Sequence, residues 1–255
     1  MRTAGIDLAT EPGATAFAAI DWSSEKAVVT SLRVGIDDDF IVTVTSDFDK
    51  VGIDCPLGWP DDFARFIAAH HGCKDLPTTD LQGADWRRQL AYRATDRTVR
   101  ANTGLVPLSV AADRIGLTAM RAAALLARLS ESGHPVDRTG SGVVVEVYPA
   151  ASLACWELPT RGYKGRKNRA QLVSLVQELG RAAPWLDLGG HAKLCASNDD
   201  AFDAVIAAIT SRAAALGLTQ TPRDRESLEL AAAEGWIALP NAPLSALVDK
   251  SAPTV

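Results

Sequence analysis

The stretch KVGIDCPLGWP, residues 50–60, repeats a phrase that first occurs in RTAGIDLAT, residues 2–10. Each stretch is a short apolar run that leads into an aspartate, Asp7 in the first and Asp54 in the second. Alternate residues of a strand share a face, so each aspartate has a small glycine beside it. A strand that ends in this way puts its carboxylate near the carboxyl edge of a sheet, where α/β proteins tend to bind ligands.

The rest of the chain alternates between strand and helix patterns. Strand patterns occur at residues 2–10, 13–22, 26–34, 50–60 (stopping at Pro56) and 142–149. The first three are separated by turns, which favours an antiparallel meander. The run at 37–49 is compatible with a strand or a helix, and the spacing of its aromatic residues favours a helix. Further helical patterns occur at 60–72, 83–102, 110–133, 166–180, about 197–216 and in the first part of 224–240. This order indicates an α/β layer architecture.

Composition is that of an ordinary globular protein. Of the 255 residues, 47% are hydrophobic and 22% are charged. The net charge of −5 argues against a strongly basic nucleic-acid binder but leaves room for a local basic groove. The four cysteines form no C-x-x-C pair, which predicts neither a zinc site nor a disulfide framework and fits a reduced cytoplasm. No secretory signal or membrane-spanning run is expected, so we predict a cytoplasmic location without a membrane partner.

Acidic residues also interrupt two apolar segments farther along the chain. SNDDAFDAVIAAI, residues 197–209, holds Asp199, Asp200 and Asp203, and GVVVEVYP, residues 142–149, holds Glu146. Aspartates in a first helical turn offset the partial charge of the helix terminus, but Asp203 lies about a turn further in. Buried carboxylates need a partner or a metal. An ion-pair cluster with arginine or lysine would satisfy them, and a hard divalent cation fits the set better.

Six motifs in this order resemble domain-of-unknown-function family 429, which is described as predicted nucleases of ribonuclease H-like fold. The motifs are GIDLAT, GIDCPLGWP, YRATDRTVR, EVYPAAS, NDDAFDAVIAAI and EGWIALP, and the resemblance runs from about residue 3 to residue 240. It implies a five-stranded mixed sheet, three antiparallel strands followed by parallel ones, with helices on both faces. We expect a single domain over residues 1–240, with a helical insertion at about 60–135 after the fourth strand and a tail at 241–255.

The resemblance also implies a set of site residues. The catalytic acids and ligands of Mg²⁺ or Mn²⁺ would be Asp7, Asp54, Asp200 and Asp203. Glu146 matches a family position that we include among the metal ligands, although a supporting or structural role fits it too. Cys55 departs from the small apolar residue expected after the second strand aspartate, and nothing nearby marks it as an activated nucleophile.

Basic residues near two of these motifs are candidates for binding the phosphates of nucleic acid. In RGYKGRKNR, residues 161–169, they are Lys164, Arg166 and Lys167, and in YRATDRTVR they are Arg93 and Arg97. Helix arginines suit phosphate or carboxylate. An ordinary solvated or salt-bridged helix surface explains both groups equally well.

The function predicted from these residues is a metal-dependent nuclease that hydrolyses phosphodiester bonds of DNA or RNA. Two alternatives stay open. GIDLAT resembles the first phosphate loop of small-molecule kinases of the actin-like fold, although Ala9 stands where such loops usually have glycine. The same fold could also be a non-catalytic nucleic-acid-binding module. The sequence leaves the oligomeric state open.

Overall fold

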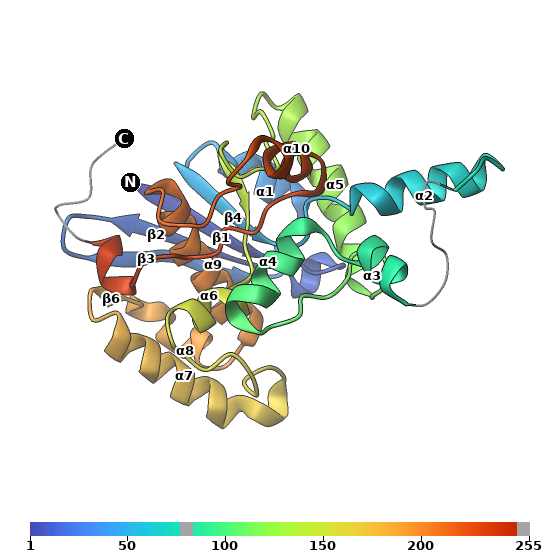
Figure 1. Ribbon diagram of the computed structural model, residues 1–255. Helices are drawn as coiled ribbons and strands as arrows, with labels where there is room; N and C mark the ends of the chain where they lie inside the picture. The colour runs from blue at the N-terminus through green and yellow to red at the C-terminus, as the bar shows by residue number, and fades with distance from the viewer. Residues whose placement is uncertain (77–83, 249–255) are drawn as a thin grey trace.

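A mixed β-sheet forms the centre of the protein (Figure 1). The computed structural model describes residues 1–76 and 84–248. Across the sheet the six strands run in the order β5-β4-β1-β2-β3-β6. Their bounds are β1 Arg2–Asp7, β2 Ala16–Trp22, β3 Ala27–Val34, β4 Lys50–Asp54, β5 Val144–Glu146 and β6 Leu186–Asp187.

The first three strands form the expected antiparallel meander, since β2 pairs antiparallel with both β1 and β3. Strand β4 lies parallel to β1, and β5 lies parallel to β4. The predicted count of five strands was wrong by one, because β6 adds a short strand parallel to β3. Its two residues are too few to show the alternation of apolar and polar side chains that marks a strand in a sequence.

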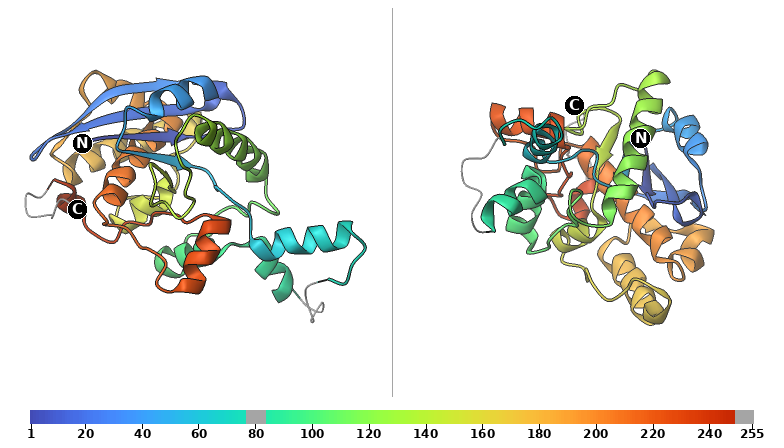
Figure 2. Two further views of the ribbon diagram at one scale, coloured as in Figure 1. Left: turned by 90° about the horizontal axis from the view of Figure 1, so that it is seen from above. Right: turned by 90° about the vertical axis from the view of Figure 1, so that its right-hand side faces the viewer.

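Helices cover both faces of the sheet, as predicted (Figures 1 and 2). On one face α9 (Asp199–Ala215) packs against β1, β2 and β4, and α6 (Pro149–Cys155), α7 (Arg169–Ala182) and α8 (Ala192–Cys195) complete that core. On the other face α1 (Asp38–Thr45) and α5 (Ile115–Glu131) cover a second core. The helix favoured at 37–49 is therefore confirmed as α1. Burial on both faces explains why β1 reads as a nearly continuous apolar run.

The repeated Gly-Ile-Asp phrase explains how α9 approaches the sheet so closely. Gly5 and Gly52 are register partners on β1 and β4. A Cβ atom at Gly5 would collide with the backbone of Ala204 and Ala208, and one at Gly52 would collide with the side chain of Ser211. The backbone of α9 therefore rests directly on these two strands, and the beginning of the helix lies toward the strand ends.

Between β4 and β5 the chain forms α2 (Asp61–His71), α3 (Asp85–Ala91), α4 (Ala94–Thr103) and α5. The pattern at 83–102 predicted a single helix, and its first residue lies outside the described ranges. The structure divides this pattern at Tyr92 and Arg93, because the carboxylate of Asp96 accepts a hydrogen bond of 2.9 Å from the backbone N–H of Arg93 and begins a new helix there. Helices α2 and α3 project from the body of the protein (Figure 2).

The C-terminal part of the chain returns to the sheet. After α10 (Arg225–Glu234), the backbone N–H of Ala238 donates a hydrogen bond of 2.9 Å to the carbonyl of Glu146 on β5. The predicted tail at 241–255 contains the 3₁₀ turn η4 (Leu244–Leu247), whose two leucines are buried. Its residues 249–255 lie outside the described ranges. Other 3₁₀ turns are η1 (Pro12–Ala14), η2 (Arg166–Asn168) and η3 (Gly189–His191). No helix in residues 1–76 and 84–248 is long and apolar enough to cross a membrane.

Candidate active site

Two carboxylates lie side by side at the carboxyl ends of the central parallel strands. Asp7 ends β1 and Asp54 ends β4, and the two residues are register partners. Neighbouring strands are about 4.8 Å apart, so the two side chains project from the same edge of the sheet. Burial, followed by the charge of Asp54, raises the pKa of Asp7 well above its ordinary value. Burial raises the pKa of Asp54 to about 7, with the charge of Asp203 adding to the effect.

Helix α9 brings the third carboxylate to this edge. The side chain of Asn198 accepts a hydrogen bond of 2.7 Å from the backbone N–H of Ala201, so the helix begins at Asp199. Asp203 then lies one turn inside and is fully buried. Asp200 is only partly buried and lies closer to the rim, where burial and the charge of Asp199 raise its pKa. The charges of Asp203 and Asp200 both act on Asp7, and Asp203 is the stronger of the two.

Tyr163 and Lys164 hold Asp203 from the loop that precedes α7. The hydroxyl of Tyr163 donates a hydrogen bond of 2.8 Å to Oδ1 of Asp203, and Nζ of Lys164 lies 2.6 Å from Oδ2. Burial and the charge of Asp203 raise the pKa of Tyr163, so its hydroxyl stays a donor. Although burial opposes the charge of Lys164, Asp203 and Asp54 offset this and raise its pKa. In the structure the ammonium of Lys164, which the sequence predicted as a phosphate contact, lies among the acids.

Glu146 and Arg93 form a separate, fully buried ion pair behind this edge. The guanidinium of Arg93 makes contacts of 2.6 and 2.8 Å with the two oxygens of Glu146. It also bonds Asp96 at 2.9 and 3.2 Å. Oε2 of Glu146 accepts a further hydrogen bond of 2.9 Å from the backbone N–H of Leu57, two residues beyond Cys55. The charges of Glu146 and Arg93 thus compensate each other within the protein.

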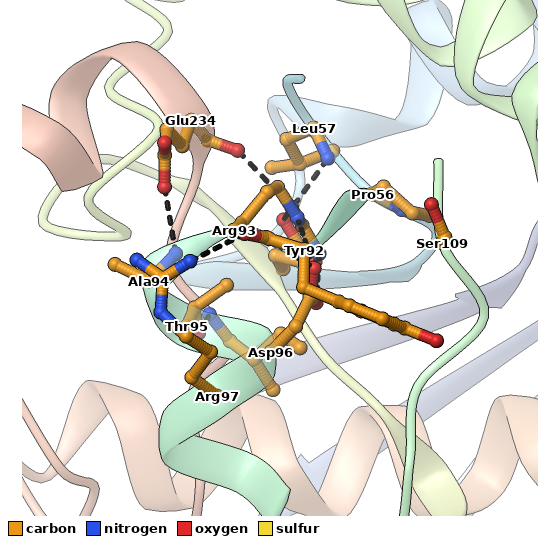
Figure 3. Close-up of polar contacts among 12 residues, drawn as sticks. Pro56, Leu57, Tyr92, Arg93, Ala94, Thr95, Asp96, Arg97, Ser109 and Glu234 are labelled. Atoms are coloured by element: carbon orange, nitrogen blue, oxygen red, sulfur yellow. Dashed lines mark hydrogen bonds and ion pairs between the residues drawn. The ribbon is translucent and has the colours of Figure 1, made fainter. Parts of the chain in front are cut away.

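Glu234 extends this buried network to the helix starts around it (Figure 3). One of its carboxylate oxygens accepts a hydrogen bond of 2.9 Å from the backbone N–H of Asp61, and the other accepts one of 2.7 Å from Ala94. Arg93 donates a hydrogen bond of 3.1 Å to the backbone carbonyl of Glu234. The loop that follows Asp54 is therefore fixed at Leu57 by Glu146 and at Asp61 by Glu234. Sequence reasoning missed Glu234, whose only local signal is an acid at the end of an amphipathic helix.

A pocket of about 400 Å³ opens over the strand ends. Its lining combines the acids of β1 and β4, the buried ion pair, the Lys164 side chain and several apolar residues. The residues are Asp7, Leu8, Asp54, Cys55, Pro56, Arg93, Pro107, Leu108, Ile115, Glu146, Val147, Tyr148, Ala150, Thr160, Lys164 and Ile237. Cys55 is buried, and burial raises the pKa of its thiol well above the ordinary value, so it stays protonated at neutral pH. The pocket therefore offers oxygen donors and one ammonium, without a thiolate.

The other basic residues singled out from the sequence lie on the surface. Arg97 is exposed and donates a hydrogen bond of 2.6 Å to the backbone carbonyl of Tyr92. Arg166 and Lys167 are exposed in η2, at the beginning of α7, and neither lines the pocket. The structure therefore brings together Asp7, Asp54, Asp203 and Lys164, with Asp200 at the rim. It leaves the remaining basic candidates outside the pocket or, for Arg93, buried in an ion pair.

Together the fold and the site define an α/β protein whose aspartates gather at the carboxyl edge of a mixed sheet, against a pocket. Within residues 1–76 and 84–248, no three histidine, cysteine, aspartate or glutamate side chains already form a metal-ligating group. The chain belongs to the family described as proteins of unknown function, DUF429, whose model matches residues 5–227. Comparisons with curated proteins and with solved structures found no significant match.

Proposed function

We propose that this protein is a nuclease that uses Mg²⁺ or Mn²⁺ to hydrolyse phosphodiester bonds of DNA or RNA. The observation that carries the proposal is the meeting of Asp7, Asp54 and Asp203 at one sheet edge, from three elements that are distant in the chain. Burial raises the pKa of each carboxyl group, and the charge of a neighbouring aspartate adds to the effect: Asp54 and Asp203 at Asp7, Asp203 at Asp54, and Asp199 at Asp203. Such a cluster is stabilised by a multivalent cation, and oxygen ligands are those that Mg²⁺ and Mn²⁺ prefer.

The topology supports a ribonuclease H-like fold as part of this proposal. Strands β1 to β3 form the antiparallel part of the sheet, β4 and β5 continue it in parallel, and helices lie on both faces. This matches the arrangement that the family resemblance implies, with β6 as an addition at the edge. In that fold the site is formed by acids of the first strand, the fourth strand and the C-terminal helix. The corresponding residues here are Asp7, Asp54 and Asp203. Fold alone does not establish activity, so the proposal depends on these side chains.

The donor set fits a divalent ion. Oδ2 of Asp203 is buried, faces the Lys164 ammonium and accepts no hydrogen bond of good geometry from the described residues. Asp7 and Asp54 line the adjoining pocket, where they are open to an entering ion and its water molecules. Asp7, Asp54 and Asp203 would hold the ion, with Asp200 at the rim. When bound, such an ion lowers the pKa of water and offsets charge on the phosphate.

Neighbouring residues hold the acids of this site in position and supply positive charge around it. Tyr163 orients Asp203 through its hydrogen bond to Oδ1, which leaves Oδ2 facing the Lys164 ammonium. Glu146 and Glu234 fix the loop after Asp54, so the carboxylate of Asp54 keeps its place at the strand end. The exposed Arg166 and Lys167 follow Lys164 closely in the chain and supply positive charge for the backbone of a nucleic-acid strand.

The test is cleavage of a panel of nucleic acids by the purified full chain in Mn²⁺ or Mg²⁺. The panel includes single- and double-stranded DNA, RNA, DNA–RNA hybrids and branched DNA. We expect EDTA to abolish cleavage. Asp54→Asn should reduce it by about 100-fold or more, because it removes one of the carboxylates that would bind the ion. Glu229→Gln, on the exposed face of α10, is the matched control and should cleave like the wild type.

Three results would contradict the proposal. Cleavage that persists in EDTA would exclude the metal site as its origin. Binding of Mn²⁺ and nucleic acid without turnover of any polymer would identify a binding module of the same fold. Transfer of a phosphoryl group from ATP to a small molecule, without polymer cleavage, would favour a kinase.

A further inference from the structure

Lys164 already supplies a positive charge to the carboxylate cluster. Its Nζ lies 2.6 Å from Oδ2 of the fully buried Asp203. The charges of Asp54 and Asp7 also act on this ammonium, so it serves all three acids and not Asp203 alone. Because Lys164 comes from the loop before α7 and the acids come from β1, β4 and α9, this contact is a property of the tertiary fold.

The loop around Lys164 is built to keep the ammonium in this position. Tyr163 is buried, packs edge-on against Phe202 with ring centroids 5.8 Å apart, and bonds Asp203 through its hydroxyl. The backbone N–H of Gly165 donates a hydrogen bond of 3.2 Å to Asp199, at the first turn of α9. Gly165 has a φ of +87°, a conformation that side chains rarely adopt. The residues on both sides of Lys164 are thus tied to α9, while the lysine side chain itself remains 58% exposed at the pocket.

The charges of the cluster indicate how many divalent ions it can hold. When ionised, Asp7, Asp54 and Asp203 carry three negative charges, and Lys164 carries one positive charge. One divalent ion added to this set gives a neutral site, whereas two divalent ions would leave a net charge of +2 among buried groups. Uncompensated charge in such a low-dielectric setting is strongly unfavourable. Asp200 lies at the partly exposed rim, and its charge acts on Asp7 less strongly than the charges of Asp54 and Asp203 do.

We propose that the ammonium of Lys164 takes the place of a second divalent ion, so that the site of this protein holds a single divalent ion. The inference rests on the proposed function, since it takes the same aspartates as ligands. It deepens that function, because one divalent ion and a lysine, and not a pair of ions, would then face the substrate phosphate.

The experiment counts bound Mn²⁺ per chain and reads its environment by electron paramagnetic resonance, independently of any cleavage. We compare the wild type with Lys164→Met, Lys164→Arg and the exposed Lys193→Met, which loses the same charge outside the site. Wild type, Lys164→Arg and Lys193→Met should each bind one Mn²⁺ with the six-line spectrum of an isolated ion. In Lys164→Met two ions would leave a net charge of +1 in place of +2, so its second Mn²⁺ should bind at least about tenfold more tightly than any second ion of the wild type, and the spectral broadening of neighbouring ions should appear at lower Mn²⁺ concentration.

Thermal unfolding in EDTA at pH 8 provides a second measurement. Lys164→Met should melt at a lower temperature than Lys193→Met, because three carboxylates then lack their counter-ion. Added Mn²⁺ should raise the melting temperature of Lys164→Met by more than it raises that of the wild type. Two closely spaced ions in the wild type, or a second ion that binds Lys164→Met no more tightly than the wild type, would overturn the inference while leaving a metal-dependent nuclease intact. No bound ion in any variant would overturn both. If Lys164→Met does not fold, two ions in Lys164→Arg would still refute the inference.

Discussion

Replacing Arg93 with methionine tests whether the buried ion pair holds the loop after Asp54. The guanidinium is 1% exposed, and it contacts Glu146 and Asp96, whose side chains are equally inaccessible. Methionine fills much of the volume but leaves two carboxylates without their shared cation. Removing one partner of a buried ion pair costs about 3–5 kcal/mol of unfolding free energy. For a chain of this size that corresponds to a fall in melting temperature of roughly 6–20 °C.

Urea unfolding followed by tryptophan fluorescence and far-UV circular dichroism measures this loss. Arg100→Met is the matched control: Arg100 is exposed on the same helix, and its replacement should change stability by less than about 0.5 kcal/mol. The double variant Arg93→Met, Glu146→Leu should lose clearly less unfolding free energy than the sum of the losses of the two single variants, because it also removes one of the carboxylates left without a cation. The loss in Arg93→Met should also be smaller at pH 5 than at pH 8, since protonation relieves the unpaired acids.

A loss below about 1 kcal/mol in Arg93→Met would refute this reasoning, because the network would then not depend on its cation. Strict additivity in the double variant would refute it as well, since it would mean that Arg93 and Glu146 act on stability independently.

Three further predictions concern the carboxylate edge and the helix that supplies it. The pKa of Asp54 is about 7 in the folded state and near 4 in the unfolded chain, so the folded protein binds more protons between these pH values. In EDTA, the free energy of unfolding should therefore fall by about 2–4 kcal/mol as pH rises from 4 to 8. A urea midpoint that rises over this range would contradict the prediction. Gly5→Ala should cost about 3 kcal/mol or more, or prevent folding, because the Cβ collides with the backbone of α9. Gly180→Ala, with open space around it, should gain about 0.5–1 kcal/mol in the same denaturation assay. Tyr163→Phe keeps the buried ring but leaves its carboxylate acceptor without that donor, and should lower unfolding free energy by about 1–3 kcal/mol; an unchanged midpoint would show that water replaces the hydroxyl.

The main elements of the fold were predictable because they carry their own local signals. Strands β1 to β4 are apolar runs bounded by turns, and α9 begins at an asparagine cap followed by two acids. Strand β6 and helix α8 have two and four residues, respectively, which is too short for any periodic pattern. The break between α3 and α4 depends on the cap that Asp96 provides and on the tertiary contact of Glu234 with Ala94, and a helical pattern at 83–102 conceals both.

The acids of the candidate site were predictable, but their partners were not. An aspartate at the end of an apolar strand is visible in the sequence, and so is a glutamate inside one. Which of the 26 lysines and arginines meets each acid is decided by contacts across the whole chain. Arg93 is 53 residues from Glu146, and Lys164 is 39 residues from Asp203, so neither pairing has a local signal. The sequence therefore shows where the acids lie along the chain, but not that Arg93 pairs with Glu146 or that Lys164 pairs with Asp203.

The arrangement of charges follows from the way α9 packs. The backbone of α9 rests on Gly5 and Gly52, and the beginning of the helix extends toward the carboxyl ends of β1 and β4. Asp203, one turn inside the helix, is therefore buried beside those strand ends. The acids of the site thus come from elements that pack directly against one another in the core. The ammonium of Lys164 comes from a loop and has an exposed side chain. The site therefore combines carboxylates that the packed core holds in place with a cation that comes from a loop, and a contact of 2.6 Å between Lys164 and Asp203 joins the two.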